Sequence, residues 1–224
     1  GGTGGWVTYI GGSGSDYAED LALSGSEIIV LGYTGSNNTL GTLVNTLGNP
    51  VAPEQTFNGG SYDAFVVKLS STGTASASTY FGGTSSEYAR AVAVDNSGNI
   101  YITGYTYSSS ITYGSSTAST TNTPGIFLAK LENDLNTNNA WVGIHDGSDY
   151  DAANDIAVKA DGSSIAITGF TKSTSGFTSG TGAAYTTHGG GNYDSFAGVW
   201  TGSGTSYTTN WVTYLGGDAS YEYG

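Results

Sequence analysis

The feature that most constrains this chain is a short aromatic segment that recurs four times and usually ends in two glycines. Its copies begin at Trp6, Ala77, Trp141 and Trp211. The starting residues are 71, 64 and 70 positions apart (77−6, 141−77 and 211−141). Four copies at nearly constant spacing predict that the chain is built of tandem structural units, because self-similarity of this period is typical of repeat folds.

Each unit contains four short segments with the composition of β-strands. After the glycines come an acidic and an aromatic residue, then an apolar strand such as 92–94. A turn rich in Asn, Asp and Gly follows, best seen in 95–99, and these residues tolerate the backbone angles of hairpins. The second strand (28–33 in the first unit) has Gly before an aromatic residue, and a long polar loop separates it from the third strand (63–69). The aromatic Gly-Gly segment is the fourth strand.

This order predicts an all-β fold of consecutive β-propeller blades, each a sheet of four antiparallel strands. The repeat units span approximately 6–76, 77–140 and 141–210, and a further unit begins within 211–224. We expect three complete blades and partial flanking strands, including an outer strand at 6–10. Closed propellers need about four to eight blades, so we interpret the chain as a section of a larger propeller, with closure by a second copy as the lesser alternative. A β-solenoid is the competing architecture, but its repeats are usually shorter.

The same pattern makes two further structural predictions. Trp6, Trp141 and Trp211 should occupy equivalent positions in outer strands, because each opens a copy of the same segment. Little or no helix should be present, because Gly and β-branched residues interrupt every window with a helical period.

Two of the motifs resemble a known bacterial repeat. The segment 93–104 reads Ala-Val-Asp-x-x-Gly-Asn-Ile-Tyr-Ile-Thr-Gly, and 59–69 reads Gly-Gly-x-Tyr-Asp-x-Phe-Val-x-Lys-Leu. With Thr-Tyr-aliphatic-Gly-Gly, these resemble the SBBP β-propeller repeat. The chain departs from the pattern in two places: Gly125 stands where the other units have Asp, and 145–147 reads His-Asp-Gly. The resemblance implies a secreted or cell-surface bacterial module, usually non-catalytic and often part of a large multidomain protein, and it names no ligand.

Composition narrows the classes of partner. Eighteen acidic residues against five basic ones give a formal net charge of −13, which repels nucleic acid and anionic membrane surfaces. No apolar run is long enough to span a bilayer, so membrane insertion is not expected. Cysteine is absent, which removes disulfides and thiol chemistry. A surface of Gly, Ser, Thr and Asn with few Lys favours an extracellular or cell-surface location.

Acidic residues gather in the loops that precede the inner strands. Carboxylates at short spacing suit Ca²⁺, so the candidate metal ligands form two groups: Asp149, Asp151 and Asp155, and Asp16, Glu19 and Asp20. No loop has the full spacing of a known calcium loop, and 134–138 only begins like one. The alternative, which we favour, is that these residues cap turns and bind loop amides. No other cofactor is indicated.

The long loops emerge on the same face as the acidic residues. Four aromatic residues there fall outside the repeated positions and are candidates for stacking on sugars, with loop packing as the alternative: Tyr107, Tyr113, Phe177 and Tyr185. The two histidines lie in separate segments without other ligands at metal spacing, so we interpret them as surface residues.

The resulting functional hypothesis is a non-catalytic structural or adhesive module that binds another extracellular protein, a glycan or copies of itself. The rival is a polysaccharide-active enzyme, a glycoside hydrolase or lyase that uses two loop carboxylates. The distribution of acids separates them: acids that recur in every blade are architectural, whereas a catalytic pair belongs to one blade.

Overall fold

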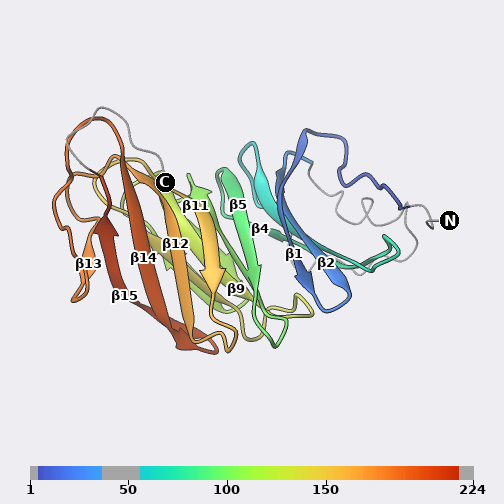
Figure 1. The fold of residues 1–224 in the computed structure, drawn as a ribbon. Helices are drawn as coiled ribbons and strands as arrows, with labels where there is room; N and C mark the ends of the chain where they lie inside the picture. The colour runs from blue at the N-terminus through green and yellow to red at the C-terminus, as the bar shows by residue number, and fades with distance from the viewer. Residues whose placement is uncertain (1–4, 37–55, 217–224) are drawn as a thin grey trace.

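Three antiparallel sheets, each with four long strands and the third with a short fifth strand at its edge, follow one another along the chain (Figure 1). The computed structural model describes residues 5–36 and 56–216. The first sheet contains β1 (Asp16–Ser24), β2 (Glu27–Thr34), β3 (Asp63–Leu69) and β4 (Ala75–Phe81). The second contains β5 (Glu87–Val94), β6 (Ile100–Thr106), β9 (Gly125–Leu131) and β10 (Trp141–His145). The third contains β11 (Asp151–Val158), β12 (Ser164–Thr171), β14 (Asp194–Ser203) and β15 (Ser206–Tyr214).

Within each sheet the strands lie in the order of the sequence, as expected for propeller blades. β5 packs against both β1 and β11, so the first strand of each blade is the inner one. Figure 1 shows these three strands next to one another. The loop of the second blade adds a small hairpin, β7 (Ser110–Tyr113) with β8 (Ser116–Ser119), and β13 (Ser179–Gly180) pairs with β15. The predicted blade architecture is confirmed, and the described blades do not form a closed ring.

A β-bulge in every inner strand explains the glycine that recurs in every second strand. In the first blade the register shifts between Ala18 and Asp20, and Gly32 lies opposite Ala18. A side chain at Gly32 would place its Cβ only 2.0 Å from the carbonyl oxygen of Tyr17. The equivalent glycines, Gly104 and Gly169, would meet inner-strand carbonyl oxygens at 2.1 Å. Only glycine therefore allows the bulged backbone to approach this closely.

Apolar side chains fill the two junctions between blades. In the first junction, Val92 of β5 belongs to one cluster with Ile29 and Leu31 of β2. In the second, Ile156 of β11 belongs to one cluster with Tyr101 of β6. These five side chains are at most 7% exposed. Each contributes about 1.5–3 kcal/mol through burial, so the junctions are what hold the three sheets in one body.

The predicted outer strand at 6–10 is absent. These residues form no strand, and Tyr9 is 94% exposed. A strand requires a neighbouring strand for its backbone hydrogen bonds, and within the described residues no sheet precedes β1. Trp6 instead donates from Nε1 to the carbonyl oxygen of Ser71, at 2.7 Å. The prediction that Trp6 is equivalent to Trp141 and Trp211 is therefore wrong, although the latter two lie in the outer strands β10 and β15.

Within the described residues, 5–36 and 56–216, no helix is present, in agreement with the sequence-based prediction for this part of the chain. It follows that none in this part crosses a membrane. Of the further unit predicted at 211–224, residues up to Tyr214 belong to β15 of the third sheet, and the residues after Gly216 lie outside the described part of the chain.

Candidate functional site

A carboxylate at the start of each inner strand is hydrogen-bonded in nearly the same way in all three blades. In the third blade Asp151 accepts from the backbone amide of Gly147 at 2.7 Å, and from the hydroxyls of Thr171 and Ser173. Gly147 is the second residue of the Gly-Gly position, and Thr171 ends the second strand. The equivalent sets are Asp16 with Gly12, Thr34 and Ser36, and Glu87 with Gly83, Thr106 and Ser108.

This recurrence gives the acidic residues an architectural role. Glu87 and Asp151 each link the turn after the last strand of one blade to the first two strands of the next, and Asp16 links the turn at Gly12 to β1 and β2. Each of these capping carboxylates also satisfies the amide of a tight turn, which would otherwise be an unpaired donor in a partly buried site. Two of the candidate metal ligands, Asp16 and Asp151, are accounted for in this way, as is the equivalent Glu87 of the second blade.

The structure does not assemble either predicted metal group. Asp149 and Asp155 are exposed and each accepts from the next residue's backbone amide, while Asp151 between them is buried. In the other group, Asp20 accepts from the amide of Val92 at 2.9 Å, and Glu19 forms an ion pair with Arg90. Across the described ranges, no three Asp, Glu or His side chains come together as a metal site. Simple alternation would place residues four positions apart on the same side of a strand, but the β-bulges between Ala18 and Asp20 and between Ala153 and Asp155 interrupt it.

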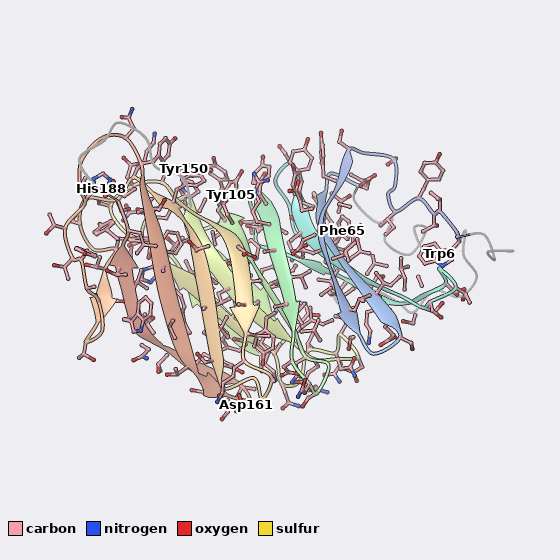
Figure 2. The ribbon with its side chains drawn as sticks, in the orientation of Figure 1. Trp6, Phe65, Tyr105, Tyr150, Asp161 and His188 are labelled. Carbon is pink, nitrogen blue, oxygen red and sulfur yellow. The ribbon has the colours of Figure 1, made fainter. Side chains whose placement is uncertain are left out.

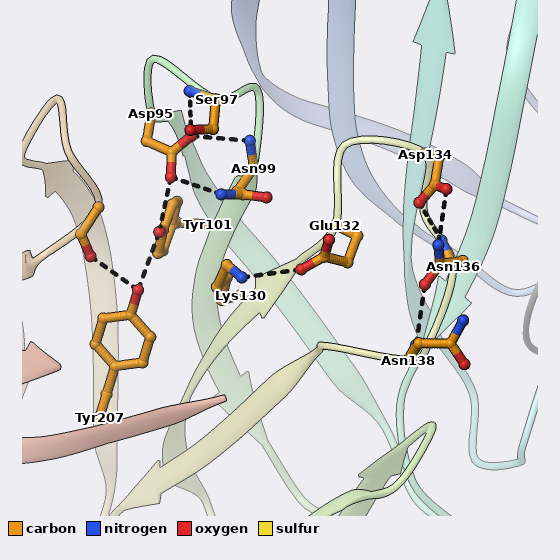
Figure 3. Close-up of polar contacts among 11 residues, drawn as sticks. Asp95, Ser97, Asn99, Tyr101, Lys130, Glu132, Asp134, Asn136, Asn138 and Tyr207 are labelled. Carbon is orange, nitrogen blue, oxygen red and sulfur yellow. Dashed lines mark hydrogen bonds and ion pairs between the residues drawn. The ribbon is translucent and has the colours of Figure 1, made fainter. Parts of the chain in front are cut away.

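The segment 134–138, which begins like a calcium loop, closes on itself (Figure 3). Asp134 accepts from the amide of Asn136 at 3.1 Å and from its side-chain Nδ2 at 2.7 Å. Asn136 in turn accepts from the amide of Asn138. These oxygens form successive Asx turns, so they serve the loop's own backbone.

A second set of carboxyls explains both departures from the repeat. Asp63 at the start of β3 lies against Gly82, where an added Cβ would be 3.0 Å from the carboxyl carbon. Asp194 and Gly216 repeat this arrangement in the third blade, with a distance of 2.5 Å. In the second blade the roles are exchanged: Gly125 makes room for Asp146, whose Cβ lies 3.1 Å from a Cβ built at Gly125. Each blade therefore keeps one carboxyl and one glycine at this place.

The carboxyls at this place have different pKa shifts in the first and second junctions. Burial, together with the charge of Glu87, raises the pKa of Asp63 to about 8. Burial also raises the pKa of Glu87, and that of Asp151 to about 6. The pKa of Asp146 is lowered although partial burial opposes this, because the Thr120 hydroxyl and neighbouring groups donate to its carboxylate. The first junction thus holds a buried acid that stays protonated at neutral pH.

An aromatic belt crosses all three blades on the face of the long loops. Stacked pairs within the blades, such as Tyr88 and Tyr105 with centroids 4.9 Å apart, are joined across the junctions by Tyr33 to Tyr88 at 5.1 Å and Tyr105 to Tyr150 at 5.7 Å. The belt consists of Tyr17, Tyr33, Tyr62, Tyr88, Tyr105, Tyr107, Tyr150, Phe170 and Tyr193. Sequence reasoning identified its repeated members as packing residues, but not that they form a continuous surface strip.

Two of the four candidate sugar-stacking residues lie in the core. Tyr113 and Phe177 are 0% exposed, so the expectation that they face a ligand is wrong. Their loops fold back over the blades, and burying an aromatic ring there is more favourable than exposing it. Tyr107 is 41% exposed at the edge of the belt. Tyr185 is 65% exposed, but its backbone pairs with the end of β15, away from the belt.

The histidines are not free surface residues either. His145 donates from Nε2 to the carbonyl oxygen of Phe177 at 2.6 Å, and burial lowers its pKa. Its ring also packs against Trp200, with centroids 5.6 Å apart. The side chain of His188 is only 6% exposed, and its Nδ1 accepts from the amide of Gly190. Packing of both rings into the outer part of the third blade accounts for them without a metal.

A polar pocket of about 420 Å³ opens on the opposite face, between the second and third blades (Figure 3). In its wall Asp95 accepts from the hydroxyl of Tyr101 at 3.0 Å, and that hydroxyl lies 3.1 Å from the hydroxyl of Tyr207. Lys130 and Glu132 form an ion pair of 2.9 Å beside them. Figure 2 places Asp161 of this pocket at the edge of the molecule opposite Tyr105 and Tyr150. Nothing in the sequence distinguished these residues, because they lie in ordinary strands and turns of the repeat.

Comparison with known proteins agrees with this architecture. Residues 78–112, which include β4 (from its fourth residue), β5 and β6, match the model of the family described as the SBBP β-propeller repeat. A search of curated proteins found no match. The matched residues contain the Gly-Gly turn, the capping Glu87 and the bulge glycine Gly104. All three features recur in the first blade, and the third blade has the capping acid and the bulge glycine but Asp146-Gly147 in place of Gly-Gly; in both blades the capping acid is Asp. The stretch 78–112 therefore matches the SBBP β-propeller repeat, within a chain built of three similar blades.

Proposed function

We propose that this chain is a non-catalytic adhesive β-propeller module of an extracellular bacterial protein, and that it binds a surface glycan through the aromatic belt. The belt carries the proposal because it is a continuous strip of aromatic side chains on the face where the long loops emerge. Loops held by a rigid scaffold are the usual place for binding.

Two exposed rings form the contact points of the proposed site. Tyr17 and Tyr107 are 44% and 41% exposed, whereas the rings between them are partly covered by one another. Aromatic faces stack on sugar rings, and the phenolic hydroxyls are available for hydrogen bonds. Burial raises the pKa of Tyr33 to about 12, so this ring of the belt keeps its hydroxyl as a hydrogen-bond donor even in moderately alkaline solution.

The use of the recurring carboxylates supports the non-catalytic part of the proposal. Asp16, Glu87 and Asp151 each accept several hydrogen bonds as caps, and the same role occurs in every blade. A glycoside-cleaving pair would need two carboxyls of different protonation on either side of a bound sugar. The family resemblance and the strongly acidic, cysteine-free composition support the extracellular location.

Affinity electrophoresis against a panel of neutral and acidic bacterial polysaccharides tests the proposal. Wild type should be retarded by at least one polysaccharide, and Tyr17→Ala/Tyr107→Ala should bind about 30-fold more weakly if each ring contributes about 1 kcal/mol. Tyr185→Ala is the matched control, an exposed tyrosine outside the belt. Binding that survives the double substitution unchanged contradicts the assignment to the belt. Release of new reducing ends during incubation would favour the enzymatic alternative.

A further inference from the structure

The pocket between the second and third blades arises from a difference between the two junctions. In the third strand of the first two blades, Lys68 and Lys130 occupy the same position, and both are only 5% exposed. Residues of the next blade lie beside both side chains, on the face opposite the long loops. The contacts that the next blade makes with the lysine differ between the two junctions.

In the first junction Lys68 finds an acceptor for every N–H of its ammonium group, two of them from the next blade. Nζ of Lys68 donates to the backbone carbonyl of Asn133 at 2.5 Å and to its side-chain Oδ1 at 2.8 Å. Glu27 completes the set with an ion pair of 2.9 Å. The ammonium group therefore has three acceptors for its three N–H donors. Asn133 reaches this position because the connection from β9 to β10 is long, running through residues 132–140.

In the second junction the corresponding connection is a tight hairpin. β14 ends at Ser203 and β15 begins at Ser206, so only Gly204 and Thr205 lie between them. This turn does not reach Lys130, and Glu132 is its one acceptor among the described residues. Two N–H donors of a buried ammonium group therefore remain available at a pocket of about 420 Å³. That volume lies within the range of small-ligand sites.

The remaining groups of the pocket define what those donors would bind. Asp95 already accepts four hydrogen bonds, from Ser97, from Tyr101 and twice from Asn99. Glu132 uses Oε1 for Lys130, and its other oxygen accepts from no described residue. The site thus offers free ammonium donors next to one free carboxylate oxygen. A hydroxyl group is both acceptor and donor, so a vicinal diol matches this pair: one oxygen accepts from Lys130 while a hydroxyl donates to Glu132.

We propose that this pocket is a second binding site, which takes a neutral saccharide through a vicinal diol held by Lys130 and Glu132. Charged ligands fit less well. The carboxylates of Asp95, Glu132 and Asp161 in the wall repel phosphates and uronic acids. A cationic ligand would meet the ammonium of Lys130 and carboxylates that are largely occupied. The site is on the face opposite the aromatic belt and does not depend on it.

Isothermal titration with maltose, cellobiose and lactose, and with digalacturonate as the charged comparison, tests this proposal. At least one neutral disaccharide should bind wild type, and digalacturonate should not. Lys130→Met, which keeps the aliphatic stem, should lower the affinity at least about tenfold, the loss expected for a charge-assisted hydrogen bond. Binding of none of the neutral disaccharides, or equal binding of digalacturonate, overturns the proposal.

A pair of glycine substitutions tests the location without touching a buried charge. Gly204 has a φ of 60° and an added Cβ there meets no atom within 4 Å, and Gly25 in the first hairpin has the same properties. Asn tolerates this left-handed backbone, so both substitutions should fold. Gly204→Asn adds a carboxamide to the pocket wall and should reduce disaccharide binding at least about fivefold, whereas Gly25→Asn should not. Unchanged binding by Gly204→Asn refutes the site. The Tyr17→Ala/Tyr107→Ala variant should bind disaccharide normally, which separates this test from that of the belt.

Discussion

Replacing Asp63 by Asn should remove much of the stability that the protein loses as the pH rises from about 4 to about 8. Asp63 is 0% exposed, and its Oδ2 accepts from the backbone amide of Asn58 at 2.6 Å. Its Oδ1 has no hydrogen-bond partner among the described residues, and the buried carboxyl of Glu87 lies close by, because a Cβ built on Gly82 would meet Glu87 Oε2 at 2.4 Å and Asp63 Oδ1 at 3.1 Å. Burial and the charge of Glu87 together raise the pKa of Asp63 to about 8. The fold therefore stabilises the neutral acid.

The sign and size of the effect follow from proton linkage. In the unfolded chain this carboxyl loses its proton near the ordinary value of 3.8, whereas in the folded protein it does so near 8. Between these values the folded state binds the extra proton, so the free energy of unfolding falls as pH rises, by up to about 1.4 kcal/mol per pH unit. The contribution is fully present below pH ~4, is lost by pH ~8, and amounts to ~5 kcal/mol at most. Asn carries no charge and still accepts from Asn58, so Asp63→Asn should equal wild type near pH 4 and exceed it by ~2–4 kcal/mol at pH 9.

Urea unfolding followed by tryptophan fluorescence at about pH 4, 6, 7.5 and 9 measures this difference. Asp161→Asn is the control, because the pKa of this exposed carboxylate is lowered by hydrogen bonds from Ser163 and by Lys159. A lowered pKa contributes stability that is already complete above the unfolded value, so the control should differ from wild type by a constant amount between pH 6 and 9. Parallel curves for wild type and Asp63→Asn over the same range would refute the reasoning.

Three other outcomes are expected. Asp146→Gly should lower the free energy of unfolding by ~2–4 kcal/mol, because it removes the junction carboxylate. The double variant Gly125→Asp/Asp146→Gly should recover at least half of this loss in urea unfolding. No recovery would contradict the inference that Gly125 and Asp146 have exchanged the roles of carboxyl and glycine. Leu21→Thr should change the free energy of unfolding by less than ~0.5 kcal/mol, whereas Val92→Thr should lower it by ~1–2 kcal/mol, as measured by thermal unfolding. Equal losses for the two variants would contradict the difference in exposure between the two sites. EDTA and millimolar Ca²⁺ should give the same melting temperature, because Asp151 is already saturated by hydrogen bonds; a calcium-dependent rise would restore the metal hypothesis.

The blade architecture was predictable because each rule involved is local. Hairpin turns, alternating strands and the Gly before each aromatic residue depend on neighbours in sequence, and Gly32 meets the bulged strand beside it. The exchange of Gly125 and Asp146 appeared as two unrelated departures, because these residues come together only across β9 and β10. The pocket was invisible for a similar reason. The pocket exists because a loop of the next blade stops short of Lys130. How closely a loop approaches a side chain of another blade cannot be predicted from composition or from the spacing of motifs.

The uncovered face of the first blade has the same side-chain pattern as the faces buried in the two junctions. Leu21, Val92 and Ile156 each lie five residues after a capping carboxylate, so they occupy equivalent positions in the inner strands. Val92 and Ile156 are 7% exposed because the preceding blade covers them, whereas Leu21 is 61% exposed. At the other end, Asp155 is the equivalent of Asp20, whose carboxylate accepts from the amide of Val92 in the next inner strand at 2.9 Å. Asp155 accepts from its own neighbour's amide, and its position would meet the inner strand of a following blade. Both ends of the three-blade body therefore match the surface of a further blade of the same kind, which supports its interpretation as a section of a larger propeller.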